Sequence, residues 1–174
     1  MNIEIRRGSL LDQHDVDVIV NAANRSMRGG GGIDGAIHRA AGPGLLAELI
    51  EKCPQGCPAG EVVVTGAHNL LFRYIFHTPG PIWRGGNDGE PEVLASCYRR
   101  CLEEAAKLKL ASIGFCSIST GVFGYPVQAA AQIALRTVLD SAAPLDRVVF
   151  AMFGSDEYGE FIRWHRRITA QHQV

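Results

Sequence analysis

The stretch between residues 16 and 42 constrains the fold more than any other part of the chain. An apolar strand at 16–20, with Asp17 inside it, is followed by two asparagines, four successive glycines at 29–32 and a helix that begins at Asp34. Four adjacent glycines cost more conformational entropy to order than other residues, so they suit a backbone that takes positive φ or lies flat against a ligand. A strand, a glycine loop and a helix start in succession are typical of an anion-binding site, because backbone N–H groups and the positive helix end converge there.

A second loop, residues 117–126, repeats this arrangement with the sequence SISTGVFGYP. It leaves an apolar strand and enters a helix near Pro126, whose fixed φ and missing N–H favour the first helical position. The loop offers hydroxyl donors, glycines and an aromatic ring, from Ser117, Ser119, Thr120, Gly121, Gly124 and Phe123. Two such loops suit one diphosphate held from both sides. A triphosphate-binding loop is excluded, because it needs GxxxxGK followed by Ser or Thr, and no lysine follows a glycine cluster here.

Apolar and helical segments alternate along the chain. Strands are predicted at residues 3–5, 16–20, 62–65, 74–77, 112–117 and 148–152. Helices are predicted at residues 34–41, continuing over 45–52, and at 90–108, 127–140 and 157–169. The glycine-rich residues 85–89 are expected to form a flexible surface loop. Strands separated by helices predict an α/β fold with helices on both faces of a largely parallel sheet, and ligands in such folds bind at the carboxyl ends of the strands.

Composition limits the class of protein. A chain of 174 residues with 47% hydrophobic residues has enough apolar material for one domain, which we expect to span residues 1–174. Its net charge of -1 gives no general attraction to nucleic acid, so a nonspecific nucleic-acid binder is not expected. The N-terminus lacks the pattern of a signal peptide, and no apolar run approaches the ~20 residues of a membrane span. We therefore expect a cytoplasmic protein that does not engage a membrane.

Five cysteines, an odd number, fit a reducing compartment better than a disulfide framework. The pairs Cys53/Cys57 and Cys97/Cys101 are each four residues apart, a spacing that invites a zinc interpretation. Structural zinc sites usually have two residues between paired cysteines, and the second pair lies in a helical pattern where small thiols suit a buried face. Neither a metal nor a cofactor is therefore expected.

Five ordered motifs together resemble the MacroD-type macrodomains. They are NAAN at 21–24, GGGGIDGAIHRAAGP at 29–43, GCPAGE at 56–61, HTPGPIW at 77–83 and SISTGVFGYP at 117–126. The resemblance runs over most of the chain. It implies a three-layer α/β/α sandwich around a mixed, mainly parallel sheet of about six strands. Members of that family bind ADP-ribose, and many hydrolyse mono-ADP-ribose from acidic side chains of proteins or deacetylate O-acetyl-ADP-ribose.

The resemblance also assigns ligand-contact positions. Residues 30–33 and 117–123 match the family loops that hold the diphosphate and the distal ribose, with Phe123 packed against that ribose. Phe153 matches the aromatic position beside adenine, and residues 9–10 match the position that reads the adenine edge. The full set implied for ADP-ribose is Ser9, Leu10, Ala22, Asn24, Gly30, Gly31, Gly32, Ile33, Asp34, Ser117, Ser119, Thr120, Gly121, Val122, Phe123 and Phe153.

Two positions depart from the family pattern. The family usually has an aspartate, in a Gly-Asp-Ile-Thr run, where this chain has Ser9. A serine hydroxyl would accept the adenine amino group without charge assistance, at a cost of ~1 kcal/mol. Pro79 stands where the family usually has valine, which removes one backbone N–H and stiffens the turn.

For hydrolysis, the resemblance implies a water positioned against the bond between the distal ribose and an acyl group. Asp34 matches the family's acidic position, and Asn24 would hold the ribose hydroxyls and the water. Because Asp34 lies in the first turn of a helix, its ionised form should be stabilised, which predicts a weak base that mainly orients water. His38, one turn later on the same face, would bond the carboxylate. Structural alternatives remain for all three: turn capping by Asn24, helix capping by Asp34 and core packing by His38.

Three functions therefore remain open. The favoured one is a hydrolase that acts on an ADP-ribosylated protein or on O-acetyl-ADP-ribose, supported by the presence of both Asn24 and Asp34. The second is a noncatalytic reader that binds ADP-ribose. The third is a regulatory binder of protein or RNA, for which the near-neutral charge gives no support. A monomer is expected.

Overall fold

The computed structural model describes residues 1–173. Within this range the strands are β1 (Asn2–Arg7), β2 (Val18–Ala23), β3 (Val63–Thr65), β4 (Tyr74–Pro79), β5 (Ser112–Phe115) and β6 (Arg147–Met152). The α-helices are α1 (Gly32–Ala41), α2 (Pro43–Lys52), α3 (Glu90–Lys107), α4 (Val127–Leu139) and α5 (Ser155–His172), and a short 3₁₀ turn, η1 (Leu10–Asp12), follows β1. Every segment that the sequence predicts as strand or helix is one in the structure; the ends differ, and the helical segment predicted from residue 34 to 52 is divided in two.

The strands form one sheet in the order β1-β6-β5-β2-β4-β3. Neighbouring strands are parallel except β3 and β4, which run antiparallel at one edge. The sheet is therefore mixed and mainly parallel, as predicted. Because β1, β6, β5 and β2 run in the same direction, their carboxyl ends meet at one side of the sheet, and the segments that follow them converge there.

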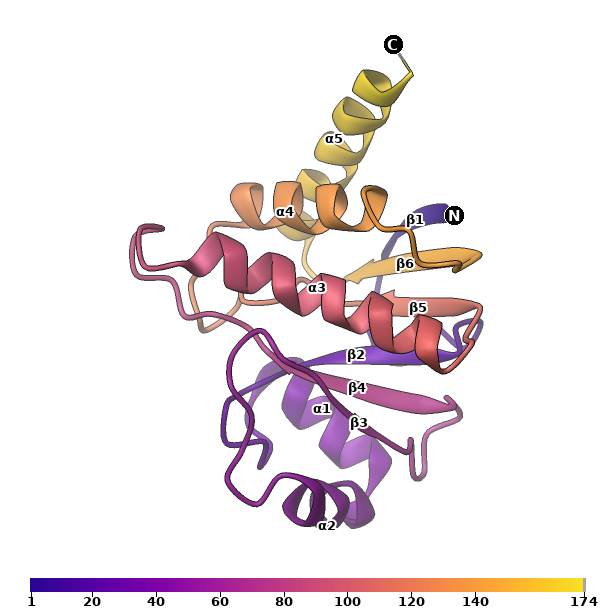
Figure 1. Cartoon of the computed structure of the whole chain (residues 1–174), viewed down its shortest axis with the longest axis vertical. Coiled ribbons are helices and arrows are strands. Elements are labelled where there is room, and N and C mark those ends of the chain that lie inside the picture. Colours follow the sequence, from indigo (N-terminus) through magenta and orange to yellow (C-terminus); the bar gives the residue numbers. More distant parts are fainter. Residues whose placement is uncertain (174) are drawn as a thin grey trace.

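Helices cover both faces of the sheet in a three-layer α/β/α arrangement. Figure 1 shows α3 and α4 side by side in front of the strands and α1 behind them, while α5 packs against α4 and β1. A cluster of buried aromatic rings lies under the front helices. Ring centroids are 5.0 Å apart for Tyr98 and Phe115, 5.6 Å for Phe115 and Phe150, and 5.3 Å for Phe150 and Phe161. These rings join α3 and α5 to the strands β5 and β6.

The strand β2 begins and ends later than the sequence predicts. Asp17, expected inside the strand, precedes it, and its carboxylate accepts the N–H groups of Ala111 at 2.8 Å and Ser112 at 3.2 Å. The strand instead continues through Ala23, because it is paired with β4 along its whole length. Asn21 consequently lies inside the strand and is fully buried, rather than in the loop after it.

A sharp turn separates α1 from α2. Gly42 has a φ of +85°, which residues with a side chain rarely adopt, and Pro43 starts α2. The predicted helical segment with its continuation therefore forms two helices.

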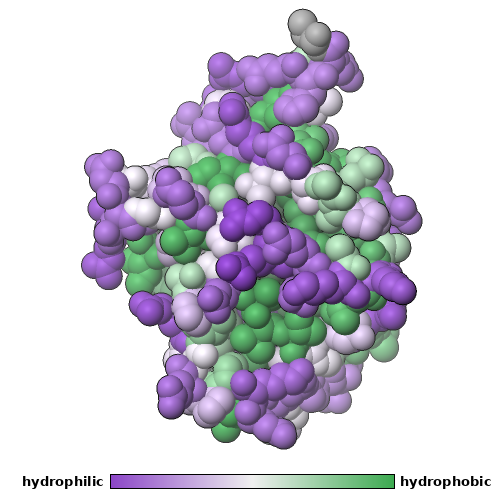
Figure 2. All heavy atoms as spheres, in the orientation of Figure 1, coloured by the Kyte–Doolittle hydropathy of each residue, from purple (hydrophilic) through white to green (hydrophobic). Residues whose placement is uncertain are grey.

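The surface drawn in Figure 2 is uneven in polarity. Apolar residues gather below α3, over the β3–β4 edge, while the projecting end of α5 is mostly hydrophilic. Within residues 1–173, no helix is both long and apolar enough to cross a membrane.

All five cysteines are buried and outside any disulfide. Burial raises the pKa of the Cys57 and Cys97 thiols to about 11, so both stay protonated at neutral pH. Cys97 and Cys101 lie on the buried face of α3, as the helical pattern predicts. In the part of the chain that the structure describes, no three His, Cys, Asp or Glu side chains are grouped to hold a metal ion.

Candidate functional site

A large cavity opens where the parallel strands end. Its volume is about 710 Å³, within the range of small-molecule sites. Every residue that the family resemblance assigns to ligand contact lines it. Further lining residues, which sequence reasoning missed, are Ala23, Ala36, Gly80, Cys116, Ala151 and Glu157. Most of these are small residues near strand ends, and strand register rather than a local motif brings them to the cavity.

The glycine loop before α1 forms one wall of the cavity. Gly29 and Gly32 have φ values of +89° and +58°, so part of this loop does need glycine for its backbone shape. At Gly30 the space is tight: a Cβ there would lie 3.3 Å from Nδ2 of Asn24, which would have to shift by a few tenths of an ångström, and 3.4 Å from Oδ2 of Asp34. Helix α1 begins at Gly32, earlier than predicted, which puts Asp34 in its first turn. The first N–H groups of this helix have no helical acceptor and are suited to an anion.

The loop 117–126 forms another wall. Ser119 adopts a φ of +68°, and its buried hydroxyl has no hydrogen-bond partner within the described residues. The Thr120 hydroxyl is already engaged, because it donates to Oγ of Ser117 at 2.7 Å. Val122 is fully exposed beside the cavity. A phosphate or ribose oxygen that reached Ser119 would satisfy a buried polar group.

Asp34 lies in the cavity wall and is only 5% exposed. One of its carboxylate oxygens, Oδ1, accepts a hydrogen bond from Nδ2 of Asn21 at 2.8 Å. Burial raises the pKa of Asp34, while the bond from Asn21 and the nearby His38 act in the opposite direction. The sequence predicted a carboxylate stabilised in its ionised form at a helix start. That prediction is wrong, because the loss of solvent outweighs the favourable partners.

Asn21 links Asp34 to a buried histidine. The Nδ2 atom that bonds Asp34 also lies 3.1 Å from Nδ1 of His77 on the neighbouring strand. An amide nitrogen can only donate, so Nδ1 accepts, and the His77 proton is on Nε2, which donates to Oγ1 of Thr65 at 2.9 Å. Thr65 in turn donates to the carbonyl oxygen of Gly66. Burial lowers the pKa of His77 to about 3, which keeps its ring neutral.

Asn24 has structural partners as well as a place in the cavity lining. Its Nδ2 donates to the carbonyl oxygen of Gly29 at 2.9 Å, and its Oδ1 accepts from the Ser26 hydroxyl at 2.5 Å and the Met27 N–H at 3.1 Å. Asn24 therefore caps the turn that leads into the glycine loop. An amide carries two N–H groups, so one is left for a ligand.

His38 lies behind Asp34. The described cavity lining does not include it, and its ring packs against Gly29. Its Nε2 is 3.4 Å from Oδ1 of Asp34, but the geometry does not make a hydrogen bond. The expected bond from His38 to the carboxylate is therefore only a close contact.

The other end of the cavity is formed by the segments after β1 and β6. Ser9 caps η1, where its Oγ accepts the Leu11 N–H at 3.2 Å. Phe153 is 80% exposed, which leaves its ring available to a ligand rather than to the core. Glu157, in the first turn of α5, adds a carboxylate to this lining.

Sequence comparisons identify relatives over most of the chain. The Macro domain family matches residues 20–134. A Macro domain-containing protein of Caldanaerobacter subterraneus is 48% identical over 160 residues, which cover 90% of this chain and 91% of that protein. One from Listeria monocytogenes is 53% identical over 140 residues, which cover 79% of each chain.

Solved structures share the fold. The Oceanobacillus iheyensis macrodomain with ADP matches with a TM-score of 0.90 at 43% identity, over 97% of this chain and 92% of that one. A mutant of the same macrodomain with ADPR gives a TM-score of 0.92 at 41% identity, over 97% and 94%. The Trypanosoma brucei macrodomain in complex with ADP-ribose gives 0.81 at 44% identity, over 93% and 68%. With this sheet order, this cavity and these relatives, the chain belongs to the macrodomain family.

Proposed function

We propose that the cavity binds ADP-ribose, with the diphosphate between the glycine loop 29–32 and the loop 117–123. Residues of both loops line the cavity, and the start of α1 adds the positive end of a helix with its free N–H groups. The exposed ring of Phe153 suits the adenine base. The proposal is supported by the macrodomains of Oceanobacillus iheyensis and Trypanosoma brucei, which were solved with ADP and with ADP-ribose.

We further propose that the protein is a hydrolase that frees ADP-ribose from an acyl group. The substrates are proteins that carry mono-ADP-ribose on an acidic side chain, and O-acetyl-ADP-ribose. Water breaks the ester bond between the distal ribose and the acyl group. Its hydroxyl ends on one fragment and its proton on the other, which gives ADP-ribose and a carboxylic acid.

The observation that carries this proposal is the arrangement of the Asp34 carboxylate. Asn21 holds Oδ1, while Oδ2 is turned toward Gly30 in the glycine loop. A carboxylate with one oxygen fixed and the other at the ligand loop can orient a water molecule. Because burial raises its pKa, Asp34 is also a stronger base than an exposed aspartate and can accept part of the water's proton.

Release of free ADP-ribose tests the proposal. The protein is incubated with a target that is mono-ADP-ribosylated on glutamate and, separately, with O-acetyl-ADP-ribose, and the free ADP-ribose or acetate is quantified. We expect release that proceeds with time and requires Asp34. Tight binding of ADP-ribose in calorimetry without any release would make the protein a noncatalytic reader. Absence of binding would reject both functions.

A further inference from the structure

Hydrogen bonds to a single carboxylate hold the glycine-rich segment 85–89, for which the sequence predicted a flexible surface loop. The carboxylate of Glu90, the first residue of α3, accepts the N–H groups of Arg84 at 2.9 Å, Gly86 at 2.8 Å and Asp88 at 2.7 Å. Glu90 is only 3% exposed. These backbone donors, Arg84 foremost, lower the pKa of Glu90 to about 2, so the side chain is ionised at neutral pH. One carboxylate thus fixes the shape of the whole segment.

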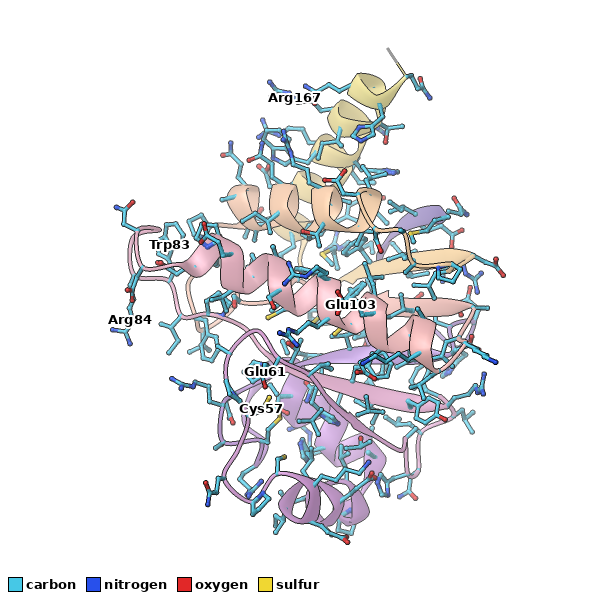
Figure 3. The ribbon with its side chains drawn as sticks, viewed as in Figure 1. Cys57, Glu61, Trp83, Arg84, Glu103 and Arg167 are labelled. Atoms are coloured by element: carbon cyan, nitrogen blue, oxygen red, sulfur yellow. The ribbon has the colours of Figure 1, made fainter. Side chains whose placement is uncertain are left out.

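Trp83 connects this segment to the cavity. Its backbone N–H donates to the carbonyl oxygen of Phe123 at 2.8 Å, and its ring centroid lies 4.6 Å from that of Tyr125. The Trp83 ring also packs against the segment 85–89, since a Cβ at Gly86 would come within 2.7 Å of its Cη2 atom. Figure 3 shows Trp83 beside the start of α3 and Arg84 pointing away from the body. Trp83 is therefore held from one side and holds the loop 117–126 on the other.

A second contact supports the same loop. Gly80 lies so close to Ser119 that any side chain at position 80 would collide with the Ser119 hydroxyl. Ser119 and Phe123 both line the cavity. The segment 80–90 thus backs two residues of the loop that faces the ligand, and the position of that loop depends on the segment behind it.

We infer that Glu90 is a positioning residue for the ligand cavity. It fixes residues 84–88, and these hold Trp83, whose N–H bonds the carbonyl oxygen of Phe123 and so sets the position of the loop around Phe123. The effect on ligand affinity rests on the proposed binding of ADP-ribose, whereas the effect on loop order does not. The ionised carboxylate is required, because three N–H donors converge on it. A glutamine would offer one oxygen and an NH₂ group that repels the remaining donors.

The test compares Glu90→Gln with Glu92→Gln. Glu92 also lies in the first turn of α3 but is exposed, so its replacement removes the same charge from the same helix end. Amide hydrogen exchange is followed at Trp83 and at Tyr125, whose N–H donates to the Ser119 carbonyl at 2.9 Å. In Glu90→Gln, exchange at both amides should accelerate about tenfold or more while exchange in β6 is unchanged.

Ligand binding gives the second readout. In Glu90→Gln the Kd for ADP-ribose should rise about tenfold, and any loss of turnover should appear in KM with kcat preserved. Glu92→Gln should change neither value. A residue that only stabilised the start of α3 would lower the melting temperature without moving exchange at Trp83 or the Kd.

A glycine pair keeps the inference testable if Glu90→Gln does not fold. Gly86 and Gly85 have φ values of +90° and +101°, so alanine strains the backbone at both, but only at position 86 would the Cβ meet the Trp83 ring. Gly86→Ala should therefore loosen the loop and weaken ADP-ribose binding, and Gly85→Ala should not.

Four results would decide against the inference or separate it from the proposed function. Unchanged exchange at Trp83 in both Glu90→Gln and Gly86→Ala would overturn the inference. An equal increase in exchange at Trp83 in the controls Glu92→Gln and Gly85→Ala would also overturn it. Faster exchange with an unchanged Kd would overturn the effect on the ligand. If the unmodified protein bound no ADP-ribose, the proposed function would fail, while faster exchange in Glu90→Gln would still support the positioning role.

Discussion

The two ends of the cavity are built in opposite ways. At one end Asp34, Asn21 and His77 are almost completely buried and are hydrogen-bonded in series. At the other end Phe153 is 80% exposed, and the Ser9 hydroxyl is bonded to its own turn. The difference fits the proposed tasks, because a group that orients water needs one fixed direction, whereas a ring that covers adenine needs only an apolar surface. Substitutions at the buried end should therefore change the rate, and substitutions at the open end should change affinity.

Replacing Asp34 should have the largest effect. Asp34→Ala is expected to lower turnover roughly a hundredfold, because the water loses the carboxylate that orients it, while the Kd for ADP-ribose changes less than about threefold. Steady-state release of ADP-ribose and calorimetry measure the two values. Equal losses in both would mean that Asp34 positions the ligand.

In the unmodified protein, turnover should fall as the pH drops through the Asp34 pKa, which lies above the ordinary value of 3.8.

Removing the hydrogen bond that Asn21 donates to Asp34 should lower turnover less than replacing Asp34 itself. Asn21→Leu keeps the branched shape and the number of side-chain heavy atoms but deletes the N–H that holds Oδ1 of Asp34, so the carboxylate loses its fixed direction and its pKa rises further. We expect turnover to fall about tenfold. The acidic limb of the pH–rate profile should also move to higher pH. A profile that keeps its position would show that Asn21 does not control Asp34.

His77 should make the free energy of unfolding depend on pH. Its pKa is about 3 in the folded protein against 6.5 when unperturbed, so between these values the unfolded chain binds one more proton. Stability should therefore fall with decreasing pH across this window, by up to about 1.4 kcal/mol per pH unit. His77→Gln keeps a donor for Thr65 and should remove this contribution. Urea unfolding at several pH values measures it, and identical slopes for both proteins would exclude a neutral, buried His77.

The smallest effect is expected at the open end. Ser9→Asp should tighten ADP-ribose binding about fivefold, because a carboxylate can still cap η1 and adds charge to the contact with the adenine amino group. AMP should gain by a similar factor, and ribose 5-phosphate, which has no base, serves as the control ligand. Unchanged affinity for ADP-ribose and AMP would mean that another lining group, such as Glu157, makes this contact.

The sequence predicted those parts of the cavity that depend on consecutive residues. Glycines at 29–32 and hydroxyls within 117–126 each lie between a strand and a helix, so the local pattern alone indicates where backbone N–H groups gather. The mainly parallel sheet followed in the same way from the alternation of strands and helices, and the structure confirms it.

Burial and pairing between distant residues could not be predicted in this way. The burial of Asn21 depends on the pairing of β2 with β4, and the raised pKa of Asp34 follows from the same enclosure. Residues 85–89 resembled a flexible loop because no local pattern shows that three N–H groups meet at Glu90. Glu157 reaches the cavity only because α5 starts where β6 ends.

The burial of every cysteine makes the protein convenient to label. Thiol reagents attack thiolates, and buried thiols with a raised pKa, such as Cys57 and Cys97, react slowly. A cysteine introduced by Val122→Cys would stand on a fully exposed loop position beside the cavity. If ADP-ribose binds as proposed, a dye attached there would lie beside the ligand, so its fluorescence would follow binding in real time with all five native thiols left in place.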